Sequence, residues 1–377
     1  MTQANVKTQL KELDKLIAAS EKFDKKKQDY TGDPTALIAA ATGKFAINEQ
    51  ETFMGRQAFT QHKGFTLESN ALAQLLGRVS VPFFGKGNGT TMDRADWETM
   101  MKKYPKYFAA IMNDLLPQID SKRLIVRTSE KNIRAILTDR YGIVDNTAAL
   151  QAIRNVLGQT ADSLKDLRIA NSTLDRDRLD LRIVFAQPKR ENPNDPTPQG
   201  ITARGDGNML NPYGYGVAVS NEETGRGGLN LNPLIWRSSC TNSIRIKSPE
   251  SINLTHIGET NVLLGRLTQA FADLLPIAAK SLDRIYEVSN KALPNLTDVI
   301  SGLAKQYSWS DDTTKQILIG TEGQETVMGL VNGVSFAATK LEAAEDQASM
   351  EMQAGTILTA PDSLFSRAAQ QSINIRR

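Results

Sequence analysis

The stretch RLIVRTSEKNIRAILTDRYGIV, residues 123 to 144, decides the fold class, because the periodicity of the chain changes here. Two runs rich in Ile, Leu and Val alternate with polar residues and are joined by the short segment 129–132, a pattern typical of a β-hairpin. Upstream of Lys122, apolar residues recur at helical spacing instead. The sequence therefore predicts that extended structure begins near residue 122.

Two further strand pairs and several helices are predicted on either side of this hairpin. The strand pairs are LKDLRIANSTL (164–174) with DRLDLRIVFAQ (177–187), and YGYGVAVSN (213–221) with GLNLNPLIWRSS (228–239). The helices are predicted over 65–82, 95–119 with a break at Pro105, 145–159, 259–292 and 325–358. The expected fold is α+β, with a central, largely antiparallel sheet built from β-hairpins and flanked by helices.

Three regions are expected along the chain. Residues 1–45 have a charged amphipathic character and are predicted to form an N-terminal helical arm that the central fold can lose. Residues 46–357 are predicted to form the α+β core, and residues 358–377 a C-terminal tail. The arm is a candidate for association between subunits.

Composition excludes several protein classes. The chain has 377 residues, 40% of them hydrophobic, so it can bury a substantial core. One cysteine and two histidines are too few for an internal disulfide or a zinc site, and no metal or cofactor is predicted. The opening is polar and no uninterrupted apolar run approaches ~18 residues, so we expect a cytoplasmic protein without membrane contact.

No catalytic signature is complete. The Gly-rich segment FFGKGNGTT (83–91) has the wrong order for a phosphate-binding loop, which needs its Lys after the final Gly. Cys240 lacks a neighbouring His and, with Trp236, is predicted to pack inward. Asp139 and Asp145 bracket Tyr141 at the end of the first hairpin, where either a metal site or a turn and a helix cap would explain them. No catalytic residue is assigned.

Arginine and lysine residues cluster on the predicted hairpins. If the strands alternate regularly, Arg134 and Arg140 share one face, and Arg237 shares a face with Arg245 and Lys247. Outward cations beside a tyrosine would follow a phosphate backbone and offer a surface for stacking bases. The predicted nucleic-acid-binding residues are Arg123, Arg127, Arg134, Arg140, Tyr141, Arg226, Arg237, Arg245 and Lys247.

The segment GVAVSNEETGRGGLNLNPLIWRSSCTNSI, residues 216–244, resembles the signature of a phage- and plasmid-encoded family known as domain of unknown function nine-three-two. In that family an SNSETG-like turn precedes a strand and an R-x-x-C-x-N-G element. The hairpin at 123–146, the helix at 65–82 and the segment VMGLVNGVSFAATKLEAAED (327–346) are also similar, so the resemblance spans about 60–355. Ser243 replaces the final glycine of the family pattern, and Glu222 replaces a serine.

The resemblance implies a protein of a phage or prophage acting in the cytoplasm of a bacterial host, and it implies no settled biochemical role. The clustered arginines favour a DNA-binding accessory protein of replication or recombination, similar in architecture to single-strand annealing proteins. Its expected partners are single-stranded DNA and further copies of itself. The alternative is a phage structural or scaffold protein whose basic strands face an acidic partner or a neighbouring subunit.

Overall fold

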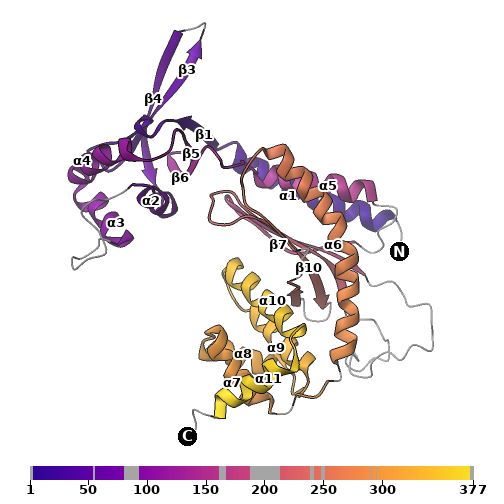
Figure 1. The fold of residues 1–377 in the computed structure, drawn as a ribbon. Coiled ribbons are helices and arrows are strands. Elements are labelled where there is room, and N and C mark those ends of the chain that lie inside the picture. The colour runs from indigo at the N-terminus through magenta and orange to yellow at the C-terminus, as the bar shows by residue number, and fades with distance from the viewer. Residues whose placement is uncertain are drawn as a thin grey trace.

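The computed structural model describes residues 3–53, 56–79, 93–160, 167–186, 213–237, 242–247, 251–289, 291–293 and 295–373. Over these residues the chain forms eleven α-helices and twelve strands in two mostly antiparallel sheets, which confirms the α+β class. The three predicted hairpins are present, but they are divided between the two sheets (Figure 1). The first hairpin belongs to one sheet and the other two belong to the second.

The first sheet is built on the hairpin β5 (Leu124–Ser129) and β6 (Asn132–Thr138), with the strand order β1-β5-β6-β4-β3-β2. Strands β3 and β4 form a long hairpin that projects away from the rest of the molecule (Figure 1). Helices α2, α3 and α4 pack on the sheet around one apolar cluster. The other elements here are β1 (Lys27–Gly32), β2 (Leu37–Ala39), β3 (Phe45–Phe53), β4 (Arg56–Leu67), α2 (Ser69–Leu76), α3 (Arg94–Lys103), α4 (Pro105–Leu115) and the short 3-10 turns Pro34–Ala36 and Leu116–Gln118.

The second sheet has the order β11-β10-β9-β8-β7, and β12 pairs with β10. Helices α1, α5 and α6 cover an apolar cluster of this sheet, and α9 and α10 pack against β11 within a second cluster that includes α7 and α11. The strands are β7 (Arg168–Leu174), β8 (Arg178–Ala186), β9 (Tyr213–Glu222), β10 (Leu229–Arg237), β11 (Asn242–Arg245) and β12 (Ile252–Leu254). The helices are α1 (Gln3–Asp24), α5 (Asn146–Thr160), α6 (Thr260–Ser289), α7 (Leu296–Tyr307), α8 (Asp311–Gly320), α9 (Val327–Ala338), α10 (Ala344–Leu358) and α11 (Asp362–Ile373).

Helix α6 is a long core helix. Over Thr260–Leu282 it is the one helix of the described chain that is long and apolar enough to cross a membrane, judged by length and composition alone. Its apolar residues Leu263, Leu267 and Phe271 recur at intervals of four and are buried against the second sheet. The packing of this face accounts for part of the apolar composition of the helix, because 33% of its most apolar stretch is buried.

The segment predicted as an N-terminal arm contributes to both sheets. Strand β1 pairs with β5 over six residues, and β2 pairs with β3, so the segment before residue 45 supplies two strands to the first sheet. Leu13 of α1 is fully buried in the cluster beneath the second sheet. The predicted tail also packs, because Phe365 and Ala368 of α11 are buried in the cluster around α7.

Candidate nucleic-acid interface

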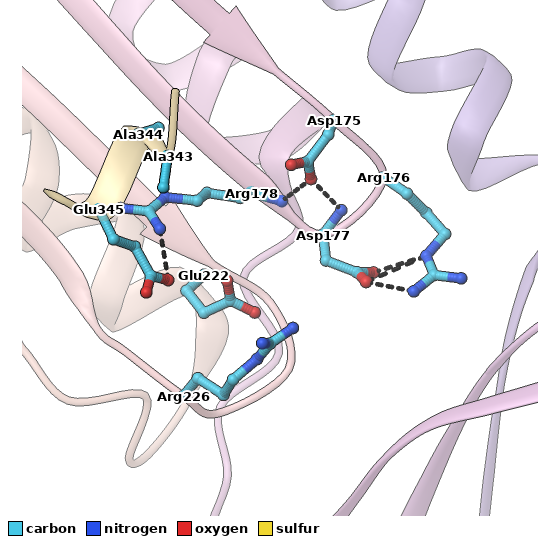
Figure 2. Close-up of a pocket in the computed structure, with 9 residues that line it drawn as sticks. All are labelled: Asp175, Arg176, Asp177, Arg178, Glu222, Arg226, Ala343, Ala344 and Glu345. Carbon is cyan, nitrogen blue, oxygen red and sulfur yellow. Dashed lines mark hydrogen bonds and ion pairs between the residues drawn. The ribbon is translucent and has the colours of Figure 1, made fainter. Parts of the chain in front are cut away.

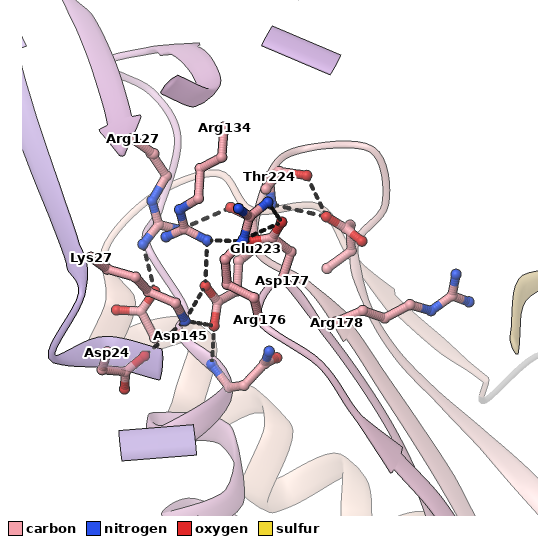
Figure 3. A network of polar contacts seen from close by, with 12 residues as sticks. Asp24, Lys27, Arg127, Arg134, Asp145, Arg176, Asp177, Arg178, Glu223 and Thr224 are labelled. Carbon is pink, nitrogen blue, oxygen red and sulfur yellow. Dashed lines mark hydrogen bonds and ion pairs between the residues drawn. The ribbon is translucent and has the colours of Figure 1, made fainter. Parts of the chain in front are cut away.

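The two sheets meet through buried ion pairs that we call the inter-sheet junction: Lys27, Arg127 and Arg134 of the first sheet with Asp177 and Glu223 of the second. The turn between β9 and β10 brings Glu223 between the two cations Lys27 and Arg134 (Figure 3). Its carboxylate oxygen Oε2 lies 2.7 Å from Lys27 Nζ and 2.8 Å from Arg134 Nη1. Arg134 Nη1 also donates to Asp177 Oδ1 at 2.7 Å. These contacts join segments that are far apart in the sequence.

Arg127 extends this network toward α5. Its Nε donates to Asp29 Oδ1 at 3.0 Å, its Nη2 pairs with Asp145, and its Nη1 donates to the carbonyl oxygen of Glu223 at 2.8 Å. The other carboxylate oxygen of Glu223 accepts the backbone N–H of Asn146, the first residue of α5, at 2.8 Å. A carboxylate at that position complements the positive end of the helix dipole.

The sequence-based prediction that Arg127 and Arg134 face outward is wrong. Arg134 is 0% exposed and Arg127 is 1% exposed. A β-bulge interrupts the register between Arg127/Thr128 and Ala135/Ile133, so the alternation that was used to place Arg134 does not hold. Both guanidinium groups are already occupied by protein carboxylates and are not available to a phosphate in this structure.

The junction carboxylates have shifted pKa values. Burial alone would raise the pKa of Asp145 and of Asp177, but the charges and hydrogen bonds of neighbouring arginines outweigh burial and lower both. Burial raises the pKa of Glu223, and the nearby Lys27 and Arg134 only partly oppose that effect. Desolvation opposes the charge of Arg127, yet its two aspartate partners raise its pKa.

Acid should weaken the junction below about pH 4. A carboxylate with a lowered pKa binds fewer protons in the native state than in the unfolded chain, so its stabilisation is present above the unfolded value of 3.8 and is lost as the pH falls below it. We expect the melting temperature to drop over this range, and the drop to be smaller in Asp145→Asn. Asparagine is an equally good helix cap. Thermal unfolding at a series of pH values measures this, with the exposed Asp312→Asn on α8 as control. If acid lowered the melting temperature of Asp145→Asn as much as that of the parent, the result would contradict this prediction.

Arg245 is held in a second buried network and is also not available outward. It is 2% exposed, and it pairs with Asp180 through Nη2 at 2.6 Å and with Glu351 of α10 through Nε at 2.7 Å. Arg182 joins the same two carboxylates, and Ser243 donates to Glu351. The prediction of a free Arg245 beside Arg237 is therefore wrong, because two acids from distant parts of the chain neutralise it.

The remaining predicted cations are accessible. Arg123, Arg140, Arg226 and Lys247 are exposed, and Arg237 is partly buried with Glu322 3.8 Å away. Trp236 is buried, as predicted, while Cys240 lies outside the described residues.

Tyr141 lies between the two sheets. Its ring stacks on His256 with the centroids 4.9 Å apart, and its hydroxyl donates to the carbonyl oxygen of Glu223 at 3.0 Å. Burial raises the pKa of this hydroxyl. One face of the ring is therefore covered, and the role of Tyr141 in stacking a base stays a prediction.

A cleft of about 580 Å³ opens beside the junction, between the β7–β8 turn, the β9–β10 turn and the start of α10 (Figure 2). Arg176, Arg178 and Arg226 line it together with four carboxylates, Asp175, Asp177, Glu222 and Glu345. Arg176 pairs with Glu68 and Asp177, and Arg178 with Glu345. Arg226 has no ion-pair partner among the described residues.

The sequence pointed to only part of this site. Asp and Arg alternate in LDRDRLDLRI, residues 174–183, yet Asp177 and Asp180 are buried and hold Arg134 and Arg245. Asp145, one of the two acids around Tyr141, pairs with Arg127. Within the described ranges no group of three His, Cys, Asp or Glu side chains comes together to hold a metal ion.

Comparison with known proteins finds no matching family model, no matching curated protein and no matching solved structure. The resemblance to the phage- and plasmid-encoded family therefore stays a prediction from the motifs.

Proposed function

We propose that this protein is a nucleic-acid-binding accessory protein of phage or prophage replication or recombination, which binds single-stranded DNA as a homo-oligomer in the bacterial cytoplasm. The observation that supports it best is the exposure of three arginines that come from both sheets, Arg123, Arg140 and Arg226.

Strand register brings the first two of these arginines together. Leu124 pairs with Thr138, so Arg123, just before β5, and Arg140, just after β6, lie at the same end of the hairpin. The exposed Asp139 lies between them in the chain and offsets part of their charge.

The β9–β10 turn packs against the same hairpin and carries the third arginine, whose side chain lines the cleft described above. Gly225 has a positive φ of 76°, and a Cβ added to it would lie 2.7 Å from Leu137 Cδ2 and 3.6 Å from Tyr141 Cε2. The turn therefore lies directly against the end of β6, and Arg226 follows at its tip. Exposed guanidinium groups without protein partners bind phosphates by displacing condensed counterions.

Charge reversal at two of these arginines tests the proposal. We expect Arg140→Glu/Arg226→Glu to bind a single-stranded oligonucleotide about tenfold more weakly at low salt, because two phosphate contacts are replaced by repulsion. The dependence of log K on log salt should flatten by about 0.7 for each lost contact. Fluorescence anisotropy with a labelled oligonucleotide over a salt series measures both quantities.

The matched control is Lys305→Glu/Lys315→Glu, which makes the same change in net charge at exposed lysines of α7 and α8. It should bind as the parent does. If the parent does not bind DNA at low salt, or if both double variants behave alike, the proposal fails and the structural or scaffold alternative replaces it. Exposed apolar residues at Ile257 and Ile319 would then be the first surfaces to examine for subunit contacts.

A further inference from the structure

The bend between α3 and α4 displays two tyrosines and three lysines on the surface. In the segment KKYPKY, residues 102–107, Tyr104 is 58% exposed and Tyr107 is 71% exposed. Lys102, Lys103 and Lys106 are exposed between and beside them. Tyrosine is usually at least half buried, so two exposed rings within four residues stand out against the ordinary surface of a protein. We call these five residues the α3–α4 bend surface.

The backbone beneath this surface is firmly held. Pro105 opens α4, and Tyr104 before it leaves the helical conformation, as the residue before a proline generally does. The carbonyl oxygen of Tyr104 accepts the backbone N–H of Tyr107 at 3.1 Å and of Phe108 at 3.0 Å. Phe108 is fully buried against Trp97, with ring centroids 6.2 Å apart. The exposed side chains therefore project from a fixed platform.

Helix stability does not explain the charge of this surface. Lys102 and Lys103 occupy the last turn of α3, where cations favour the negative end of the helix dipole. Lys106, however, lies in the first turn of α4, where a cation is unfavourable and where no acidic residue is present. No acidic residue occurs between Glu98 and Asp114 in the sequence. The fifteen residues from 99 to 113 thus carry three positive charges and no negative charge, and the charge of Lys106 is a cost to α4.

We propose that the α3–α4 bend surface binds single-stranded nucleic acid, with bases stacked on Tyr104 and Tyr107 and phosphates paired with the three lysines. The inference deepens the proposed function and rests on it, since both require the chain to bind nucleic acid. Lysines alone would fit a duplex equally well, but the bases of a duplex are stacked on one another and offer no face to an exposed tyrosine. The rings therefore select an unpaired strand.

Removing the rings tests this selection. Tyr104→Ala/Tyr107→Ala should bind labelled oligo(dT) roughly 10- to 100-fold more weakly, since each stacked base contributes about tenfold. Binding of a duplex of the same length and the salt dependence for oligo(dT) should stay as in the parent, because no phosphate contact is lost. Tyr104→Phe/Tyr107→Phe should keep the parent affinity, because phenylalanine retains the flat ring.

Changing the lysines should affect the binding of both probes and the salt dependence, unlike removal of the rings. Lys102→Gln/Lys103→Gln/Lys106→Gln should weaken binding of both probes and flatten the salt dependence by about 0.7 per phosphate contact for the single strand. Ile319→Ala, which removes an exposed apolar side chain of α8, is the control and should leave both affinities unchanged. Circular dichroism and the melting temperature verify that each variant folds.

The results for these variants distinguish a failure of the α3–α4 bend surface from a failure of the proposed function. Loss of single-strand affinity in the alanine variant, with the duplex unaffected, supports the bend surface. If Arg140→Glu/Arg226→Glu weakens binding while the tyrosine variants bind oligo(dT) as the parent does, the bend surface is wrong and the proposed function stands. If the parent binds neither probe at low salt, both are wrong, and an acidic protein surface becomes the partner that the lysines fit.

Discussion

A chain that begins at Ala46 is expected to lose its cooperative thermal transition. The deletion removes β1, which pairs with β5 from Lys27–Ser129 to Gly32–Leu124, and it removes Leu13 from the core of the second sheet. It also removes Lys27, which is 6% exposed at its side chain and pairs with the buried Glu223. Exposing the edge of β5 and leaving Glu223 with one cation fewer should together exceed the few kcal/mol by which domains are stable. Circular dichroism during heating measures the transition.

A chain that begins at Lys7 is the control for this deletion. It keeps Leu13, the whole of β1 and the hydrogen bonds from Thr147 to Ser20 and Asp24, so its transition should remain cooperative. If the chain from Ala46 also melts cooperatively, the N-terminal segment is a dispensable arm after all, as its sequence alone had predicted.

Arg134→Met is expected to lower the free energy of unfolding by about 3 to 5 kcal/mol, because it removes one partner from a buried ion-pair network. Glu223 would keep Lys27, and Asp177 would keep Arg176, but each would lose a contact shorter than 3 Å. The alternation of the strand had placed Arg134 on an outward face. The side chain is instead fully buried, so a glutamate at this position would face the carboxylates of Asp177 and Glu223. Urea denaturation at equilibrium measures the change.

Two further variants make this measurement specific. Arg123→Met removes an exposed arginine from the same hairpin and should change the free energy of unfolding by no more than about 0.5 kcal/mol. Arg134→Met/Glu223→Gln removes opposite charges together and should be more stable than the sum of the two single variants predicts. If Arg134→Met is as stable as Arg123→Met, the junction does not hold the sheets together.

The position of the junction links stability to the proposed function. Glu223, which anchors the β9–β10 turn, lies three residues before the exposed Arg226. Weakening its ion pairs would therefore release the turn that carries Arg226, one of the three exposed arginines of the proposal. A loss of DNA binding in junction variants must for this reason be compared with their stability before it is assigned to a phosphate contact.

Short-range patterns determined a large part of the fold. The alternation of apolar and polar residues and the short turns predicted the hairpins β5–β6, β7–β8 and β9–β10, and Pro105 predicted the break between α3 and α4. These features were readable because each depends on neighbours within a few residues. The hairpin β3–β4 was missed, because its segment NEQETFMGRQAFTQHK (48–63) is largely polar and lacks a marked alternation. The basic and aromatic residues of the α3–α4 bend were visible in the sequence, but their exposure was not.

Only the tertiary structure decided whether each cation is buried or exposed. Arg134 and Arg140 lie six residues apart in one hairpin region, yet the first is fully buried and the second is exposed. The carboxylate that accepts the first one belongs to Glu223, 89 residues away in the sequence. A buried charge without such a partner costs too much free energy of desolvation. No local sequence pattern indicates which distant acidic residue will lie beside a given cation. The sequence by itself therefore determined where the cations are, and the meeting of the two sheets decided which of them remain available to bind.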